Sequence, residues 1–535
     1  MRFRPLLITA LLAFASGHPL AAQARFIRPP HLTPNPNPRA PLAAVLTFGA
    51  DSPVATQVSI TDDAGRRWEL TFDPTHRPEQ GLALVGFRPG RRHTIQVMLR
   101  DRQGRETAAP TALSFMAPPL PTAAGAFPPL SVTSDAKARL EPGYTVLSVR
   151  RQGPGRPNDP FSTGWGMIVA IDAAGEPVWY YESPARISDF ERGPNGHLFL
   201  CTLDYEILEI DLLGNEVVRW YAAGRPKGAG PGIAVPTMTF HHEIDVLPNG
   251  NLVVLGTDRR ALPNYYTSET DPAAPRQTQQ VMGDEVIEFA RDGQVVWKWN
   301  AFDHLDPYRI GYETFSGYWE RRGFPDTLDW SHANNLLHDP SDDSLLVSFR
   351  YLAAIVKIDR ASGRVKWILG KPDGWSEQFR PLLFRPEGAV EWFQHQHSPF
   401  PTARGTLIVF DNGNYGTMPF APPRPPHETY SRAVEYQLDE RARTVRQVWV
   451  SETGPGPDTV LSNAMGNAEQ FPVTGNVLVF YGAVAQAGGA GWTRGREYTH
   501  TSPARLVWEV VARDPAGKIG WQFFCGTRWA NLQRP

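Results

Sequence analysis

The chain has 535 residues, with 53 Lys and Arg against 55 Asp and Glu, and a formal net charge of −2. This near balance excludes the strongly basic face by which a nucleic-acid-binding protein is normally recognised. Apolar residues make up 41% and charged residues 20%, which excludes a wholly disordered chain. Glycine (47) and proline (51) recur too often for long helices, and 16 Trp, 16 Tyr and 27 Phe favour a large all-β protein.

Residues 1–24 have the pattern of a secretory signal peptide. Arg2 and Arg4 precede an apolar run, Leu6–Ala15, and Ala22-Gln23-Ala24 offers a small-x-small cleavage site. The run is well short of the ~20 residues that a membrane-spanning helix needs. We therefore expect an exported, periplasmic protein without a membrane anchor.

Residues 25–118 predict a small β-sandwich domain. Short segments of alternating apolar and polar residues are separated by turn residues, as in immunoglobulin-like and fibronectin-like domains. A proline-rich stretch over 119–139 then predicts a stiff linker.

Residues 140–535 contain a sixfold repeat. In each unit a strand-like segment, a turn and a second strand form a predicted hairpin, which closes in turn at Trp179, Trp220, Trp297, Trp367, Trp449 and Trp521. A further strand-like segment precedes each hairpin, as in VLPNGNLVVLG and FPVTGNVLVFYG. Four strands in each of six units predict a six-bladed β-propeller. A β-solenoid would have shorter repeats, and two sandwiches would not keep one hairpin signature six times.

Aligning the repeats on their turn glycines brings three histidines into register. His242 and His397 stand eight residues before Gly250 and Gly405, and His332 is their counterpart in the fourth unit. The aligned positions in two other units are Ser188 and Asn467, of which we assign Asn467 to substrate binding. Because the first strand of each blade lines the central channel, we expect the three histidines to meet on the axis.

Arg350 ends the strand LLVSFR of the fourth unit and is expected to face the same channel. One Arg with several His suits an anionic group, which the guanidinium orients while a neutral His acts as nucleophile or proton donor. The immediate neighbour His241 is expected to turn away and be structural, whereas His395 stays open.

Two other functions remain possible on these residues. The three His could bind Zn²⁺ in a metal-dependent lyase or hydrolase, or the propeller could be a non-enzymatic binding module. No carboxylate recurs at the aligned positions, so we predict no metal. Nucleotide-binding signatures are missing, so no cofactor is expected either. Cys201 and Cys525 could be bridged or free.

Several motifs resemble, in the right order, those of the bacterial arylsulfate sulfotransferases that need no nucleotide donor. They are HHEIDVLPNGNLVVL, DWSHANNLLHDPSDDSLLVSFR, WILG, QHQHSPF with FDNGN, SRAVEYQLD and VTGNVLVF. The resemblance runs from about residue 30 to the C-terminus. Two departures are the fifth-unit turn PTARG and the absence of a closely spaced cysteine pair.

The resemblance implies sulfuryl transfer from a phenolic sulfate ester to a phenolic acceptor, by a ping-pong route through a sulfated histidine. It implies that His397 is the nucleophile and that His242, His332 and Arg350 hold the sulfuryl group and assist the leaving phenol. Asn334, two residues after His332, matches a nearby polar, substrate-binding position. The implied partners are two small phenolic molecules, and the sequence leaves open whether the protein is a homodimer.

Overall fold

The computed structural model describes residues 23–153 and 159–533, so all but the last two residues of the expected signal peptide lie outside the described residues. Within these two ranges, no helix is both long enough and apolar enough to cross a membrane. The chain forms two compact units, of which one contains residues 23–33, 45–82 and 92–115 and the other contains 34–44, 83–91 and 116–533.

The N-terminal strands form two sheets, as the alternating pattern predicts. One has the order β1 (Phe26–Pro34), β2 (Ala43–Ala50) and β5 (Leu82–Val85). The other has the order β4 (Arg67–Phe72), β3 (Ala55–Asp62), β6 (Arg92–Arg100) and β7 (Glu106–Ala108), with β8 (Leu113–Met116) also paired to β6. Every second residue of β3 is buried, which is the burial expected of a strand with one face on a core.

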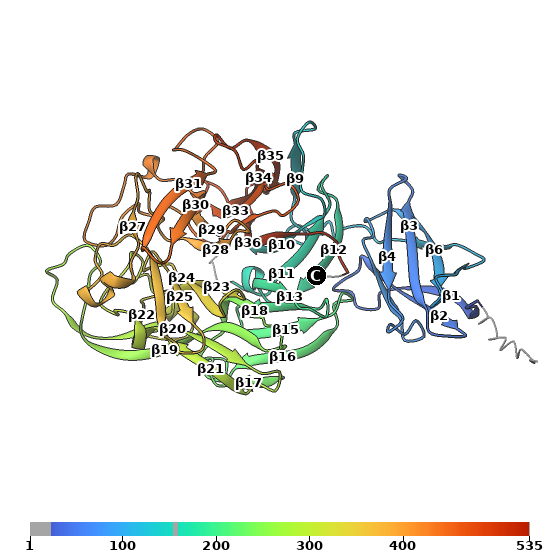
Figure 1. Ribbon diagram of the computed structural model, residues 1–535, viewed down its shortest axis with the longest axis horizontal. Coiled ribbons are helices and arrows are strands. Elements are labelled where there is room, and N and C mark those ends of the chain that lie inside the picture. Colours follow the sequence, from blue (N-terminus) through green and yellow to red (C-terminus); the bar gives the residue numbers. More distant parts are fainter. Residues whose placement is uncertain (1–22, 154–158, 534–535) are drawn as a thin grey trace, which may run out of the picture. The chain divides into compact units, whose positions relative to one another are not determined.

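The remaining strands confirm the predicted propeller architecture. Among the described residues, six sheets each contain four antiparallel strands, and Figure 1 shows them arranged around a common centre. From the centre outwards, blade 1 contains β36 (Gly520–Trp529), β10 (Tyr144–Gln152), β11 (Gly166–Ile171) and β12 (Pro177–Ser183). Blade 2 contains β13 (Ile187–Arg192), β14 (Leu198–Thr202), β15 (Glu206–Ile210) and β16 (Glu216–Ala222), and β17 (Ile233–Val235) is added at its edge.

The other four blades have the same order. Blade 3 contains β18 (His241–Val246), β19 (Leu252–Tyr265), β20 (Gln277–Phe289) and β21 (Val295–Asn300), with β22 (Thr327–Asp329) beside β20. Blade 4 contains β23 (Ala333–Asp339), β24 (Ser344–Phe349), β25 (Ala354–Asp359) and β26 (Val365–Gly370). Blade 5 contains β28 (His397–Pro401), β29 (Thr406–Asp411), β30 (Arg432–Asp439) and β31 (Thr444–Val450), with β27 (Arg385–Pro386) at its edge. Blade 6 contains β32 (Ala468–Gln470), β33 (Val477–Val484), β34 (Trp492–Tyr498) and β35 (Leu506–Ala512).

Helical segments are short and lie in the connections. They are α1 (Pro160–Thr163), α2 (Ala301–His304) and the 3₁₀ turns η1 (Glu320–Arg322), η2 (Glu377–Leu382) and η3 (Pro426–Glu428).

The glycines used to align the repeats occupy equivalent turns. Gly196, Gly250, Gly405 and Gly475 have φ of 81°, 83°, 75° and 73°. This left-handed conformation favours glycine, because a side chain there would clash with the backbone. The shared requirement explains why the same residue type recurs between the first and second strands of these blades.

The ring closes differently from the sequence prediction of a sixth hairpin ending at Trp521. Strand β36 does not pair with β35; it pairs along β10, from Tyr144–Trp529 to Gln152–Gly520, as the inner strand of blade 1. A fifth strand, β9 (Leu130–Ser134), pairs with β35 at the outer edge of blade 6 and lies inside the segment expected to be a linker. The N-terminal end of the propeller thus adds a strand to the last blade, and the C-terminal strand β36 completes the first.

Tryptophans join neighbouring blades. The indole N–H groups of Trp179, Trp220, Trp299, Trp449 and Trp508 each donate to a backbone carbonyl of the adjoining blade, at 2.9–3.0 Å. In blades 3 and 6 the residue with this role is Trp299 or Trp508, and not Trp297 or Trp521, at which the predicted hairpins end. The indole nitrogen of Trp367 in blade 4 is buried and has no hydrogen-bond partner among the described residues.

Candidate active site at the propeller axis

The histidines lie where the innermost strands are irregular. The pairing of β18 with β19 skips from His241 to Ile244, and that of β28 with β29 skips from His397 to Phe400. His242, His332 and Ser398 have φ of 57°, 47° and 47°, a strained conformation for residues with side chains. These bulges break the side-chain alternation and re-aim individual side chains.

Aromatic contacts link the predicted histidines from two blades. The rings of His242 and His332 lie 5.1 Å apart in an edge-to-face arrangement. Tyr351 stacks on His332 at 4.6 Å, and Tyr318 meets the same ring edge-on at 4.6 Å. Burial and the neighbouring histidines and Arg150 hold the pKa of His242 well below its usual range, so this imidazole is neutral near pH 7.

His397 is oriented by Asn412 of the segment after β29. Its Nδ1 lies 2.6 Å from Asn412 Oδ1, while the Asn412 amide nitrogen donates to the backbone oxygens of Ser462 and Met465. Because these two carbonyls fix the amide nitrogen, the amide oxygen must accept from His397, whose Nδ1 therefore carries the hydrogen. The Nε2 lone pair is left free to act as a nucleophile. Burial and nearby Arg350 lower the pKa of His397 to about 3.

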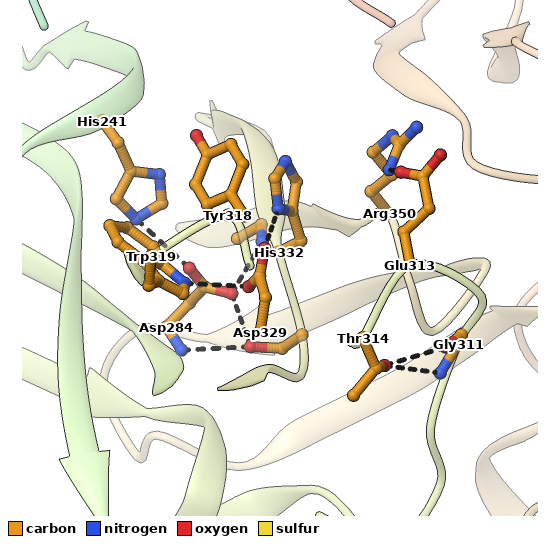
Figure 2. A network of polar contacts seen from close by, with 12 residues as sticks. His241, Asp284, Gly311, Glu313, Thr314, Tyr318, Trp319, Asp329, His332 and Arg350 are labelled. Atoms are coloured by element: carbon orange, nitrogen blue, oxygen red, sulfur yellow. Dashed lines mark hydrogen bonds and ion pairs between the residues drawn. The ribbon is translucent and has the colours of Figure 1, made fainter. Parts of the chain in front are cut away.

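His332 is paired with Asp329, which the sequence analysis missed. Asp329 Oδ2 lies 2.5 Å from His332 Nδ1, and the Trp319 indole donates to Asp329 Oδ1 at 2.9 Å (Figure 2). Burial, together with the charge of Asp284 nearby, raises the pKa of Asp329 to about 8. A protonated Asp329 donates to Nδ1 and so places the hydrogen of neutral His332 on Nε2, ready to donate to an anionic ligand.

Arg350 provides the positive charge that was expected on the axis. Its Nη1 donates to Glu313 Oε2 at 2.5 Å (Figure 2). Its Nη2 donates to the Asn463 backbone oxygen at 3.0 Å. The guanidinium has five N–H groups, so further donors remain. Burial alone would raise the pKa of Glu313, but Arg350 keeps it below the ordinary value, and the two form an ion pair.

The sequence analysis predicted that His241 turns away from the site, but in the structure His241 contacts His242. Its Nδ1 lies 2.8 Å from the Nδ1 of His242, and its Nε2 lies 3.2 Å from Asp284 Oδ1. Figure 2 shows its ring directed towards Asp284. The expectation assumed regular alternation along β18, which the bulge after His241 interrupts.

The two predicted asparagines bind backbone groups. Asn334 donates to the Gln396 backbone oxygen at 2.7 Å, and its own side-chain oxygen is buried without a hydrogen-bond partner among the described residues. Asn467 donates to the Gly526 oxygen and accepts from the Gly526 nitrogen, so it ties blade 6 to β36. His395 packs between Tyr351 and Tyr415, with ring centroids at 5.6 and 5.4 Å.

One loop of blade 6 supports both sides of the site. Besides holding Asn412 and Arg350, residues 462–466 provide the Met465 sulfur that accepts from Arg150 Nη1 at 3.4 Å. The Arg150 guanidinium also lies 4.2 Å above the Phe524 ring, which is 5.9 Å from His242. Burial lowers the pKa of Arg150 to about 9, so it is still cationic at neutral pH. Two arginines therefore make this end of the axis favourable for an anion.

A cavity of about 250 Å³ continues along the axis. Its lining includes Glu243, Asn335 and Ser398, each of which directly follows a predicted site residue, and Cys525. Cys201 and Cys525 are both free thiols, which decides between the two states left open by the sequence. Among the described residues, no group of three or more His, Cys, Asp and Glu side chains is arranged to hold a metal ion.

The structure thus brings His242, His332, His397 and Arg350 together and adds Asp329, Glu313 and Asn412 as their partners. It also places Asp284 beside His241. Asp329, three residues before His332, and Asn412, within FDNGN, were visible inside motifs already noted. Asp284 had no such signal, because it reaches the site only through the pairing of β20 with β19 and β22.

Together, these groups can bind a tetrahedral anion, attack it with an imidazole nitrogen and donate a proton. The model of the arylsulfotransferase (ASST) family matches residues 158–517. The chain is 29% identical over 207 residues to the arylsulfate sulfotransferase AssT of Escherichia coli O6:H1 (strain CFT073), covering 31% of this chain and 34% of that protein.

AssT of Lelliottia amnigena is 28% identical over 207 residues, with the same coverage, so the chain spans about a third of the length of the curated relatives it matches. The WD40 β-propeller domain of Doa1 aligns with a TM-score of 0.30 and 9% identity, over 82% of this chain and 90% of that one. The family match covers most of the propeller, including all four residues that the structure gathers on the axis. The chain belongs to the arylsulfotransferase family.

Proposed function

We propose that this protein transfers a sulfuryl group from a phenolic sulfate ester to a phenolic acceptor, without a nucleotide donor, by a ping-pong route through a sulfohistidine at His397. We propose further that it acts in the periplasm, as its N-terminal pattern suggests. The observation that carries the proposal is the orientation of His397. The Nδ1 atom of His397 lies 2.6 Å from the Asn412 side-chain oxygen, which holds the hydrogen on Nδ1 and leaves Nε2 as a nucleophile near the charge of Arg350.

In the first half-reaction, His397 Nε2 attacks the sulfur and the bond from sulfur to the aryl oxygen breaks. The phenol leaves and an N-sulfohistidine stays behind. Sulfuryl transfer resembles phosphoryl transfer in its loose transition state, so catalysis is mainly positioning and charge stabilisation. Arg350 and the Nε2–H of His332 supply that stabilisation. In the second half-reaction, an acceptor phenol attacks the sulfur and His397 is released.

The test is a burst experiment with 4-nitrophenyl sulfate and no acceptor. A covalent route releases about one nitrophenol per active site before turnover slows. The trapped protein gains the mass of one SO₃ group on the peptide that contains QHQHSP. His397→Asn should abolish both burst and label, while His395→Asn, two residues away, should retain both.

Two outcomes would contradict the proposal. A label that survives in His397→Asn and is lost in His395→Asn would move the nucleophile to His395. If no label forms in the wild type and chelation by EDTA abolishes turnover, the metal-dependent alternative holds instead.

A further inference from the structure

Three side chains of blade 3 form a hydrogen-bonded row that ends at the site, and two of them, Asp284 and His241, are buried. Asp284 Oδ1 lies 3.2 Å from His241 Nε2, and His241 Nδ1 lies 2.8 Å from His242 Nδ1. Asp284 is 3% exposed and His241 5%, so solvent cannot replace either contact. The role of this row rests on the proposed sulfuryl transfer, because His242 is the member beside the reacting group.

The acceptors around His241 determine where one of its hydrogens lies. Its Nε2 faces both Asp284 Oδ1 and the Gly256 backbone oxygen, each at 3.2 Å. Neither oxygen can donate, so Nε2 carries a hydrogen in every state. A single hydrogen then lies between the two facing Nδ1 atoms. When it is on His241, neutral His242 must carry its own hydrogen on Nε2; when it is on His242, the His242 Nε2 has the lone pair.

Asp284 is equipped to hold a cationic His241. Its Oδ2 accepts from the Ser331 hydroxyl at 2.5 Å and from the Ala333 backbone N–H at 2.6 Å. Burial alone would raise the pKa of Asp284, but the bonds from His241, Ser331 and Ala333 together bring it below its ordinary value. A buried carboxylate that stays ionised stabilises an imidazolium in contact with it.

We infer that Asp284, His241 and His242 form a proton relay that serves the leaving phenol. As the bond from sulfur to the aryl oxygen breaks, His242 gives its Nε2 hydrogen to that oxygen. At the same time, His242 Nδ1 takes the hydrogen from His241 Nδ1, so cationic His241 becomes neutral. In the second half-reaction, the acceptor phenol gives its proton to His242 Nε2, and the Nδ1 hydrogen returns to His241. His242 is neutral before and after each step.

His332 and His242 differ in the residue that would have to supply a proton to each of them. A relay through His332 would take the proton of Asp329 and leave a second buried carboxylate, close enough to Asp284 for each to disfavour ionisation of the other. Among the described residues, no Lys or Arg side chain forms an ion pair with Asp329, whose partner is the neutral His332. His332 is therefore suited to keep its Nε2 hydrogen and bind a sulfuryl oxygen, while His242 is suited to deliver a proton.

The test compares donors whose leaving groups differ in their need for a proton. 4-Nitrophenolate leaves readily without one, whereas phenolate is far more basic and needs it. His241→Asn should lower kcat/KM for phenyl sulfate by about a hundredfold or more, and for 4-nitrophenyl sulfate by less than about tenfold. Asp284→Asn, which replaces the carboxylate with an amide of the same shape and removes the charge, should lower kcat/KM selectively for phenyl sulfate as well. This second variant tests the relay if His241→Asn does not fold.

A matched control is His197→Asn, since His197 also pairs with a buried carboxylate, Glu209 at 2.8 Å, in blade 2. This variant should leave kcat/KM unchanged for both phenyl sulfate and 4-nitrophenyl sulfate. Equal losses for both donors in His241→Asn and Asp284→Asn would mean a structural role and overturn the relay. If kcat/KM for phenyl sulfate falls selectively in His332→Asn and not in His241→Asn, His332 is the general acid and the relay is overturned as well.

The relay and the proposed function fail in distinguishable ways. If the relay is right, His241→Asn still shows the nitrophenol burst and the SO₃ label on the QHQHSP peptide. If the label forms in the variant and the donor selectivity is absent, only the relay is wrong. If the wild type itself never carries the label, the sulfohistidine route is wrong, and the relay with it.

Discussion

At the scale of single residues, each histidine of the site has a neighbouring side chain that contacts its Nδ1 atom. This neighbour determines which ring nitrogen of the histidine carries the hydrogen. Asn412 acts on His397, Asp329 on His332 and His241 on His242. The partners differ in chemistry because the tasks differ. The neutral amide of Asn412 leaves a lone pair on His397, the proposed nucleophile, and the protonated carboxyl of Asp329 leaves a hydrogen-bond donor on His332.

Removing the Asn412 side chain, the partner of the proposed nucleophile His397, should slow the attack of His397 on sulfur. In Asn412→Ala, neutral His397 is free to carry its hydrogen on Nε2, where it blocks the lone pair. We expect the burst rate with 4-nitrophenyl sulfate to fall at least tenfold, about 1.4 kcal/mol of transition-state stabilisation, with the burst amplitude unchanged. Asn414→Ala is the matched control, because Asn414 binds the same loop through the Asn463 oxygen at 2.8 Å and no histidine. Equal losses in both variants would show that the loop matters and the tautomer does not.

We expect the protonated state of Asp329 to set an alkaline limit on the activity. The raised pKa of about 8 means that the shared proton is present below this pH and lost above it. Activity should therefore fall as pH rises through about 8. In Asp329→Asn, the amide can donate to His332 and accept from Trp319 at any pH. This variant should keep activity at pH 7 within about threefold, some 0.6 kcal/mol, and lose the limit near pH 8. A variant inactive at every pH would show that Asp329 acts as a carboxylate.

At the scale of elements, tryptophans in five of the blades donate a hydrogen bond to a backbone oxygen of the neighbouring blade. Trp220 is fully buried and donates to the Arg291 oxygen at 2.9 Å, whereas the buried Trp367 indole N–H has no hydrogen-bond partner in the part of the chain that the structure describes. Trp220→Phe loses volume and a hydrogen bond, but Trp367→Phe loses volume and an unsatisfied donor. We expect Trp220→Phe to be the more destabilising by about 1 kcal/mol. The urea midpoints of the two variants would check this, and the reverse order would contradict it.

At the scale of the whole molecule, the ring depends on closure by β36. This strand is the inner partner of β10, and its Arg528 pairs with the fully buried Glu497 of β34 at 3.2 Å. Deleting residues 515–535 should open blade 1 and expose neighbouring blade 2, where Cys201 is 1% exposed. We expect Cys201 to be unreactive towards a thiol reagent in the native full chain and reactive after the deletion. A truncated protein that is active with a protected Cys201 would contradict this account of closure.

The sequence by itself determined the repeat, the all-β class and the positions that meet on the axis. Turn glycines and strand alternation are local requirements, so they recur visibly along the chain. His242, His332 and His397 could be aligned from them, and Arg350 was noted at the end of a predicted strand of the fourth unit. Only the tertiary structure decided the closure by β9 and β36, because a strand exchanged between first and last blades has the same local pattern as a hairpin strand.

The partners of the histidines were likewise decided in three dimensions. His241 reaches His242 through a bulge that interrupts alternation, and Asp284 lies 43 residues further along the chain, on another strand. Hydrogen bonds between side chains depend on register and bulges, which are properties of paired strands and leave no mark in a single sequence.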